Sequence, residues 1–374
     1  MVHRHIAPLK TGLAIILAAC ALGVPIATAI AQGDSIHLTQ TAEYNLGVDC
    51  PVAAALDPAG STLWVLVDDC FQYGYVLHAY DIATGTRVNV DDHRAALSAL
   101  DGVFIDHFIM PLGFTPAGDL SIRYYDSDGA RSKNLLIPLA SGGEAVVQTS
   151  ATFDALLAAY SDYPEFSVYS PDHRRVVAFG AASLHILDVE AETEIAQIPV
   201  EGGTDYVYAS FSADGERLYV IRINDPDSAT DLSSTLLIYS LPDGRLLRQY
   251  TLPSSAVWLS PDETRAAVQL FSTNIGEQSD LIIMALDSGL TSAASSLLED
   301  PTPVISCLND GRNVSGLGYV SSGYLSLSSL DWLPDGSGLV LTLSAMGEGS
   351  QSASSFCSFN YSRLRTYTVS GAGN

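Results

Sequence analysis

The chain has 374 residues, of which 47% are hydrophobic, so it can bury a large core and is not a disordered chain. It carries 42 Asp and Glu against 17 Lys and Arg, which gives a formal charge of −25. This charge excludes nucleic acid as a partner, because an anionic protein gains nothing from releasing the counterions of phosphates. Asp outnumbers Glu 30 to 12, and because Asp favours turns where Glu favours helices, the composition indicates a turn-rich chain.

Residues 1–31 are typical of a secretory signal peptide. Two basic residues precede an apolar stretch over 11–24, and Pro25 then breaks it. Two sequences with small residues at the spacing that signal peptidase needs follow, Ala27-Thr28-Ala29 and Ala29-Ile30-Ala31. We therefore expect a mature chain that begins near Ile30 or Gln32, with residues 32–374 forming a single domain.

The stretch Leu17-Ala18-Ala19-Cys20 also resembles a bacterial lipobox, in which Cys20 is lipidated and becomes the mature N-terminus. The residues that follow Cys20 stay apolar as far as Ala31, whereas a lipoprotein tether is usually polar, so cleavage near residue 31 is favoured. Either way the domain is expected outside the cytoplasm, secreted or periplasmic. It meets a membrane only through a lipid anchor, because no later apolar run is long enough to span a bilayer.

One short pattern recurs six times after residue 50: an alternating apolar stretch, a turn related to Ser-Pro-Asp-Gly, and a second stretch typical of a strand. Pro fixes φ at the first central turn position, Asp hydrogen-bonds its own backbone and Gly accepts positive φ, so two strands reverse tightly there. The six turns are Asp57–Gly60, Thr115–Gly118, Ser170–His173, Ser212–Gly215, Ser260–Glu263 and Leu333–Gly336.

The repeat predicts an all-β fold, a β-propeller of four-stranded antiparallel blades. Several copies continue into a third strand and a second turn, best seen over 75–88 and 236–245, so each unit holds the content of one blade. The turns begin 42 to 73 residues apart along the chain, which favours six blades and leaves seven as the alternative.

The uneven spacing of the turns indicates insertions, and the chain must also close into a ring. Asp92–Ala99 and Thr152–Tyr160 have helical character, and the Ser/Gly-rich segments Ser288–Ser296 and Ser344–Ser355 are expected to form loops. We expect the closing strand to come from Ser35–Leu46 and to lie beside residues near Tyr361–Val369.

The stretch Ala209–Val220, with the sequence ASFSADGERLYV, resembles the repeats of YVTN and WD-like β-propellers, including the Pro-Asp-rich repeats of periplasmic propellers of the Tol system. The resemblance covers most of the mature chain. It implies a propeller fold and assigns no catalytic residue, because the motif describes blade structure. The His and Trp-Asp signature of true WD repeats is absent.

Four cysteines remain in the mature chain, and an even number in an exported chain indicates disulfides. Cys50 precedes one hairpin and Cys70 follows it, and Cys307 and Cys357 bracket the hairpin of the last blade in the same way. The repeat therefore predicts Cys50–Cys70 and Cys307–Cys357 bonds, worth ~2–4 kcal/mol each. A zinc site is disfavoured, because no Cys-x-x-Cys pair and no nearby His occur at ligand spacing.

Three carboxylates, Asp225, Asp227 and Asp231, fall on one stretch that could hold Ca²⁺, which prefers oxygen ligands. The stretch lacks the sixth-position Gly and the distal Glu of the helix–loop–helix calcium motif, so a solvated loop between strands is favoured. We expect no other cofactor. Asp126-Ser127-Asp128-Gly129 is interpreted as a hairpin turn.

No sequence string of a known catalytic site occurs, whether Gly-x-Ser-x-Gly, His-Glu-x-x-His, or a phosphate- or dinucleotide-binding glycine pattern. His78 and His185 occupy equivalent positions in two repeats, and these and His107 are interpreted as structural. Tyrosines near the openings of two blades could supply a binding face, since aromatic side chains combine contact area with a polar tip. They are Tyr160, Tyr163, Tyr169, Tyr206 and Tyr208.

The sequence favours a non-enzymatic scaffold that binds a protein or a cell-surface ligand at one end of the ring, where loops cluster. The alternative is a propeller-type hydrolase, such as a lactonase or a glycan-active enzyme, with carboxylates from several blades at the mouth of the central channel. The motifs do not identify the ligand or the substrate.

Overall fold

The chain divides into two compact units, Met1–Asp34 and Ser35–Asn374. The computed structural model describes parts of the second unit, and Met1–Asp34 lies outside the described residues. These are residues 35–47, 51–69, 74–89, 91, 93–100, 112–115, 117–126, 131–139, 143–148, 151–161, 167–201, 203, 207–225, 233–270, 280–296, 319–320, 325–352 and 355–371. None of the helices among them is long and apolar enough to cross a membrane.

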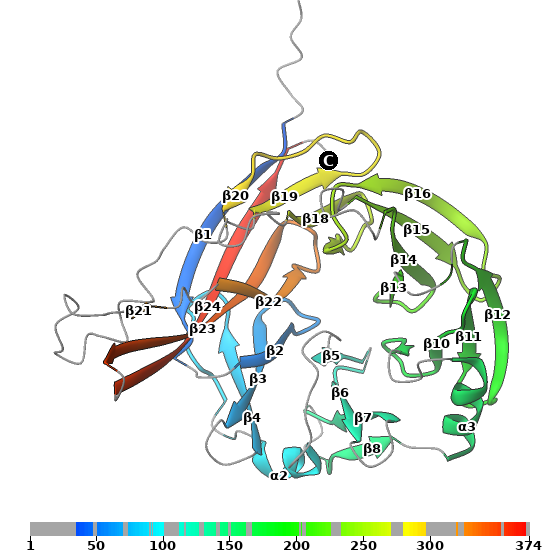
Figure 1. Ribbon diagram of the computed structural model, residues 1–374, viewed down its shortest axis with the longest axis horizontal. Helices are drawn as coiled ribbons and strands as arrows, with labels where there is room; N and C mark the ends of the chain where they lie inside the picture. Colours follow the sequence, from blue (N-terminus) through cyan, green and yellow to red (C-terminus); the bar gives the residue numbers. More distant parts are fainter. Residues whose placement is uncertain are drawn as a thin grey trace, which may run out of the picture. The chain divides into compact units, whose positions relative to one another are not determined.

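The strands of the second unit form six antiparallel sheets, the blades of a six-bladed β-propeller (Figure 1). The prediction of an all-β propeller with six blades is confirmed, and the seven-bladed alternative is wrong. Blade 1 holds β2 (Pro51–Leu56), β3 (Thr62–Asp69) and β4 (Gly74–Asp81); blade 2 holds β5 (Leu112–Phe114), β6 (Leu120–Asp126), β7 (Arg131–Ile137) and β8 (Val146–Gln148); blade 3 holds β9 (Val168–Tyr169), β10 (Arg175–Phe179), β11 (Ser183–Asp188) and β12 (Thr193–Pro199).

Blades 4 and 5 repeat this order, and blade 6 takes its outer strand from the beginning of the domain. Blade 4 holds β13 (Val207–Phe211), β14 (Arg217–Ile223), β15 (Ser234–Ser240) and β16 (Leu246–Leu252); blade 5 holds β17 (Val257–Leu259), β18 (Arg265–Leu270), β19 (Asp280–Ala285) and β20 (Ser295–Ser296); blade 6 holds β22 (Leu325–Trp332), β23 (Gly338–Ser352), β24 (Ser355–Ser370) and β1 (His37–Asn45), with β21 (Tyr319–Val320) pairing to the far part of β23. Strands within a blade are called A to D from the inside outward.

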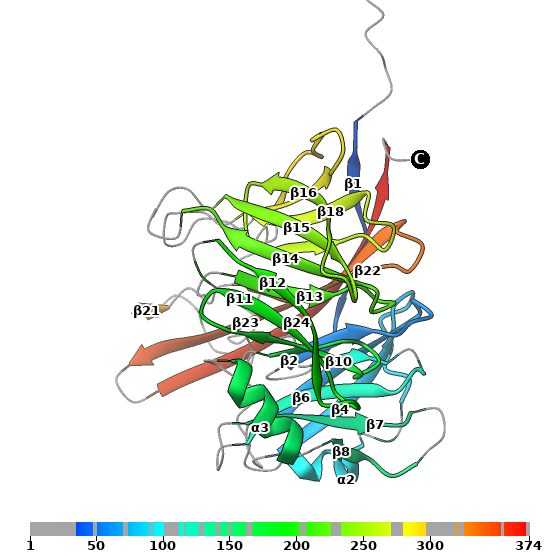
Figure 2. The same ribbon diagram turned by 90° about the vertical axis from the view of Figure 1, so that its right-hand side faces the viewer.

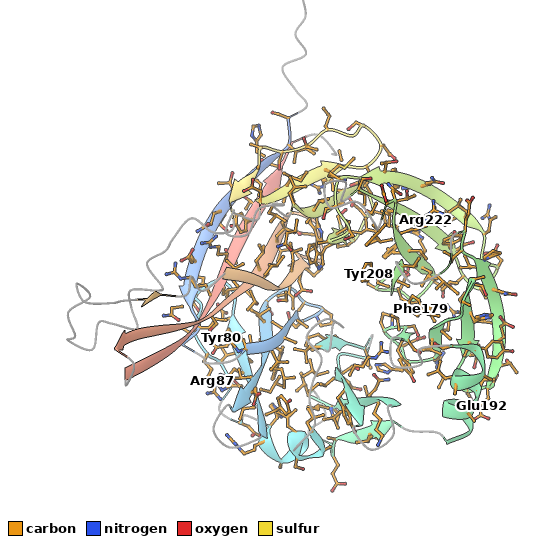
Figure 3. The ribbon with its side chains drawn as sticks, viewed as in Figure 1. Tyr80, Arg87, Phe179, Glu192, Tyr208 and Arg222 are labelled. Carbon is orange, nitrogen blue, oxygen red and sulfur yellow. The ribbon has the colours of Figure 1, made fainter. Side chains whose placement is uncertain are left out.

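Blade 1 departs from the four-stranded plan. Among its described residues an isolated bridge between Tyr80 and Arg87 stands in place of a fourth strand, and the two residues lie next to each other at the outer side of the blade (Figure 3). Burial raises the pKa of Tyr80 to about 12, and its hydroxyl donates a hydrogen bond to the carbonyl of Leu46 at 3.0 Å. This bond ties the edge of blade 1 to the chain that leaves the closing strand.

Strand β1 closes the ring by pairing along β24, with His37 opposite Ser370 and Asn45 opposite Arg363. The prediction of this closing strand is confirmed, and Figure 1 shows β1 and β24, at opposite ends of the colour scale, side by side. Glu43 of β1 binds two arginines of β24: Arg363, and Arg365, whose Nε lies 2.7 Å from Glu43 Oε2. Because Arg365 is only 5% exposed, its ion pair with Glu43 joins the two ends of the domain inside the blade.

The predicted insertions have different outcomes. The helical ones are confirmed as α2 (Arg94–Leu97) with the 3₁₀ turn Ser98–Leu100, and as α3 (Ala151–Tyr160). The Ser/Gly-rich segment 344–355 is not a loop, because β23 and β24 continue as a paired hairpin beyond the blade (Figure 2). Ser and Gly are compatible with such a ladder when a partner strand takes up every backbone hydrogen bond. Segment 288–296 forms a turn and the short strand β20.

The core lies in the seams between neighbouring blades, since side chains alternate between the two faces of each strand. Between blades 3 and 4, for example, Leu184 and Ile186 of β11 pack with Leu218 and Val220 of β14. On the opposite face of blade 3, α3 buries Leu157 against Val176, Ala178 and Leu187. The blades are therefore rigid units held by apolar contact on both faces.

All six connections between strands A and B have five residues, although other connections vary widely. They are 57–61, 115–119, 170–174, 212–216, 260–264 and 333–337. In each, the fourth residue has a positive φ and donates its N–H to the carbonyl of the first residue at 2.8–2.9 Å. Four of these residues are Gly, which adopts positive φ without strain, while His173 and Glu263 adopt it with φ of 59° and 58°.

Three of these turns are bound by an arginine of the preceding blade. Arg175 Nη1 donates to the carbonyl of Gly215 at 2.6 Å, and Arg265 Nη2 donates to that of Gly336 at 3.0 Å. Arg217 instead reaches the buried carboxylate of Glu263, with Nη1 2.5 Å from Oε1. Since each arginine begins strand B of its blade, the same contact links blades 3 to 4, 4 to 5 and 5 to 6.

Replacing Glu263 by Ala should lower the free energy of unfolding by about 2–3 kcal/mol, measured by urea denaturation. Glu263 Oε1 also accepts the hydroxyl of Tyr219 at 2.7 Å, so its removal leaves a half-buried hydroxyl and a guanidinium without their acceptor. Glu216→Ala is the matched control: its side chain is 62% exposed and 3.8 Å from Arg175, so less than ~0.5 kcal/mol is expected. If both variants lost the same free energy of unfolding, the stabilising role of the Arg217–Glu263 contact would be contradicted.

Candidate functional site

The two ends of the ring differ in the connections they carry. Because strands in a blade are antiparallel, the A–B and C–D connections meet at one end, called the turn end, and the B–C and D–A connections meet at the other, called the loop end. At the turn end the A–B connections all have five residues, and the C–D connections of blades 2 to 5 have eight, four, five and nine. At the loop end the connections range from two residues (353–354) to 28 (297–324, which include β21).

Tyr208 marks the loop end on the inner side of the ring. It belongs to β13, the innermost strand of blade 4, and lies toward the inside of the ring (Figure 3). Its partner across the ladder is Ile221, near the loop end of β14. At 58% exposure it is the most exposed large hydrophobic residue among those described, which is unusual for an innermost strand.

The five tyrosines predicted as a binding face do not all gather at one place. Tyr160, the last residue of α3, packs its ring 5.0 Å from that of His185, near the loop end of blade 3. Tyr169 instead precedes the A–B turn and lies 6.0 Å from His173 of that turn, at the turn end. Tyr163 and Tyr206 lie outside the described residues. Of the described members, only Tyr160 and Tyr208 share the loop end.

The predicted calcium stretch forms the connection between β14 and β15 at the loop end. Its base is closed by Asn224, whose backbone N–H donates to the carbonyl of Ser233 at 3.0 Å and whose Oδ1 accepts from Thr235 Oγ1 at 2.6 Å. Asp225 is exposed at this base, and Asp227 and Asp231 lie outside the described residues. Among the described residues no group of three or more His, Cys, Asp and Glu is placed to hold a metal ion.

Most of the predicted cysteine positions are not described. Cys20, Cys50, Cys70 and Cys307 lie outside the described residues, as does His107. Cys357 lies on β24, opposite Gly349 of β23. Gly349 also pairs with Val320, so β21 lies alongside this hairpin. The two disulfides remain predictions.

A chain of side-chain hydrogen bonds crosses the outer strands of blade 3. Ser183 Oγ lies 2.9 Å from His185 Nε2, and His185 Nδ1 lies 2.7 Å from Glu194 Oε1. Gln197 Nε2 donates to Ser183 Oγ at 3.0 Å. The equivalence of His185 with His78 is confirmed, because Ala178 and Val65, their partners across the ladder, both lie three residues into strand B. His78 instead contacts Tyr80 OH, with Nδ1 at 3.3 Å.

Sequence reasoning missed this network. Ser183 and His185 are two residues apart on one strand, so period-two alternation places them on the same face. Their acid partner depends on a bulge: Ile186 is opposite Ala196 and Leu187 opposite Glu194, so Ile195 is the extra residue. A bulge turns the side chains beyond it to the other face of the strand. No local sequence pattern predicts this bulge.

A second polar group lies in the seam between blades 6 and 1. The carboxylate of Asp331 on β22 accepts the backbone N–H of Leu56 on β2, with the nitrogen 3.3 Å from Oδ2. Desolvation by burial raises the pKa of this carboxyl to about 7. On the same face Ser329 and Thr342 are opposite each other, and their buried hydroxyls have no hydrogen-bond partner among the described residues.

Asp331→Asn should stabilise the protein in a pH-dependent way. Because the folded-state pKa of about 7 exceeds the ordinary 3.8, the folded protein holds a proton that the unfolded chain has lost, so stability falls as pH rises from about 4 to about 7. Asn keeps an oxygen for the Leu56 N–H and carries no charge. Urea denaturation should show equal stability of variant and parent at pH 4, and a gain of about 2–4 kcal/mol in the variant at pH 8. A gain that is the same at both pH values, or absent at pH 8, would contradict this assignment.

Comparison with known proteins leaves the function open. No protein-family model and no curated protein matches the chain. Among solved structures it is similar to the Kuenenia stuttgartiensis hydrazine synthase, with 15% sequence identity over 81% of this chain and 78% of that chain, and a TM-score of 0.39. At this identity and TM-score the likeness carries no statement about activity, so the function is argued from the residues of this chain.

Proposed function

We propose that this chain is an extracytoplasmic propeller that binds a protein or a cell-surface ligand at the loop end of its ring. The difference between the two ends carries the proposal. At the turn end the six A–B turns have the same length and three of them are bound by arginines of neighbouring blades, so these turns leave little freedom for a partner-specific surface. The loop end carries connections of unequal length, which is where a rigid scaffold usually places its binding residues.

The described loop end exposes an aromatic side chain, and the chain as a whole is anionic. Tyr208 offers a large, half-exposed ring with a polar tip, the kind of residue that anchors interfaces. A net charge of −25 with only two lysines attracts a cationic partner and speeds its encounter. A basic protein surface or a cationic cell-surface ligand therefore fits better than an anionic one.

The proposal also includes the cellular location of the protein. We propose that residues 1–31 direct export, that the domain follows the YVTN and WD-like repeat plan, and that its four cysteines form two disulfides outside the cytoplasm. Strand β1 begins at His37. Cleavage near residue 31 and lipidation of Cys20 are therefore both compatible with an intact closing strand.

Site-specific photo-crosslinking of the full chain in a cell-envelope extract tests the binding end. We expect Tyr208→p-benzoylphenylalanine to give a discrete crosslinked product that weakens as salt is raised, because the partner is cationic. The control is Leu246→p-benzoylphenylalanine: Leu246 is 46% exposed but begins β16 at the turn end. Crosslinking at position 246 but not at 208, or at neither, would reject the loop end as the binding surface.

A further inference from the structure

We propose that Ser183, His185, Glu194 and Gln197 form an acyl-transfer site on blade 3, in which Ser183 is the nucleophile that hydrolyses small carboxylic esters. The observation is the hydrogen-bond chain itself. The nucleophile lies within 2.9 Å of a base, and the base lies within 2.7 Å of a carboxylate that orients it. This is the arrangement by which serine nucleophiles are activated on unrelated folds.

The direction of the hydrogen bonds suits this chemistry. A carboxylate only accepts hydrogen bonds, so Glu194 fixes the imidazole proton on Nδ1 of His185. Nε2 then has a free lone pair, to which the Ser183 hydroxyl donates. Ser183 Oγ in turn accepts a hydrogen bond from Gln197 Nε2 at 3.0 Å. The hydroxyl proton is therefore already directed at the group that would remove it.

Blade 4 keeps polar residues at two of the four positions, because Thr235 corresponds to Ser183 and Gln249 to Gln197, and it replaces the other two. Blade 4 has the same bulge at the same place, with Ile238 opposite Arg248 and Tyr239 opposite Leu246. In register, its Leu237 corresponds to His185 and its Leu246 to Glu194. Blade 5 has Ile282 at the position of His185. Apolar residues can thus replace the histidine and the glutamate in a blade of the same geometry.

Gly180 and Tyr160 pack closely around the imidazole of the set. A Cβ at Gly180 would come within 2.9 Å of His185 Nε2 and 3.1 Å of the Tyr160 carbonyl oxygen. Any residue with a side chain at position 180 would therefore displace the ring. Tyr160 of α3 lies against the His185 ring, with centroids 5.0 Å apart, and shields it from bulk water. Ser183 begins β11 at the loop end, directly after the three-residue connection 180–182.

The reaction follows from these positions. Ser183 Oγ forms a bond to the ester carbonyl carbon while its proton passes to His185 Nε2, and the carbonyl oxygen takes up the negative charge. The second N–H of the Gln197 amide can donate to that oxygen. Collapse of the intermediate breaks the carbon–oxygen bond to the alcohol, which leaves with the proton from His185. Water then attacks the acyl-serine by the same route, returning a proton to Ser183 and releasing the carboxylic acid.

The substrate class follows from access and charge. Ser183 is 7% exposed and Tyr160 covers the neighbouring imidazole, so only a small acyl group can approach the Ser183 Oγ. The net charge of −25 disfavours anionic substrates near any surface of the protein. We therefore expect uncharged or cationic short-chain esters.

Covalent labelling of the full chain tests the nucleophile. A tagged fluorophosphonate should add one phosphonyl group per chain, and mass spectrometry of peptides should place it on Ser183. Ser183→Ala should remove the label, and His185→Gln should slow labelling and p-nitrophenyl acetate hydrolysis by at least about 100-fold. Glu194→Gln, which keeps the side-chain length and removes the charge, should also slow both.

A second serine of the chain provides the matched control. Ser35 Oγ lies 2.8 Å from His37 Nε2 with the same two-residue spacing, and no carboxylate contacts His37 among the described residues. Ser35 should stay unlabelled, and Ser35→Ala should label at Ser183 like the parent. Peptide mapping of the parent decides even where a variant fails to fold. The proposal is overturned if Ser183 is not labelled, if Ser35 is labelled as fast, or if labelling ignores the loss of His185. Thermal destabilisation of Ser183→Ala without labelling of the parent would make the network purely structural.

Discussion

The pairing of β1 with β24 closes the ring of six sheets in this protein. The two strands come from opposite ends of the domain, so the first described strand completes the last blade. Glu43 reinforces it by binding Arg363 and Arg365 across the ladder. Closure removes the freedom of blades 1 and 6 to separate, which lets the other seams keep their close packing.

The contacts between neighbouring blades also constrain the two ends of the ring differently. The A–B turns sit where neighbouring blades approach, and their constant length and positive φ let an arginine of one blade reach the turn of the next. A change in turn length there would misplace that contact. The loop end has no such constraint, so it accommodates helices, long connections and exposed side chains such as Tyr208. The binding surface and the acyl-transfer site that we propose both lie at the loop end.

The sequence predicted the parts of this structure that depend on local chemistry. Pro, Asp and Gly at the six turns report backbone conformation directly, so blade number and hairpins followed, and the alternating strand Ser35–Leu46 had no other place than the last blade. The contacts between arginines and the turns of the next blade could not be predicted, because the partners are far apart in the sequence. Arg265, for example, hydrogen-bonds the carbonyl of Gly336, 71 residues away. The hydrogen bond from His185 to Glu194 depends on a bulge at Ile195 that leaves no local signal. The separation of Tyr169 from Tyr208 likewise depends on where each falls along its strand.

Hydrogen–deuterium exchange of the full chain, followed by mass spectrometry, tests closure most directly. If β1 is an integral strand of blade 6, the amides of His37–Asn45 should exchange as slowly as those of the buried strands β10 and β14, and should lose protection together with β24 as urea is added. Fast exchange of β1 while β24 and the other blades stay protected would show that the ring is held without its first strand, and would contradict the account.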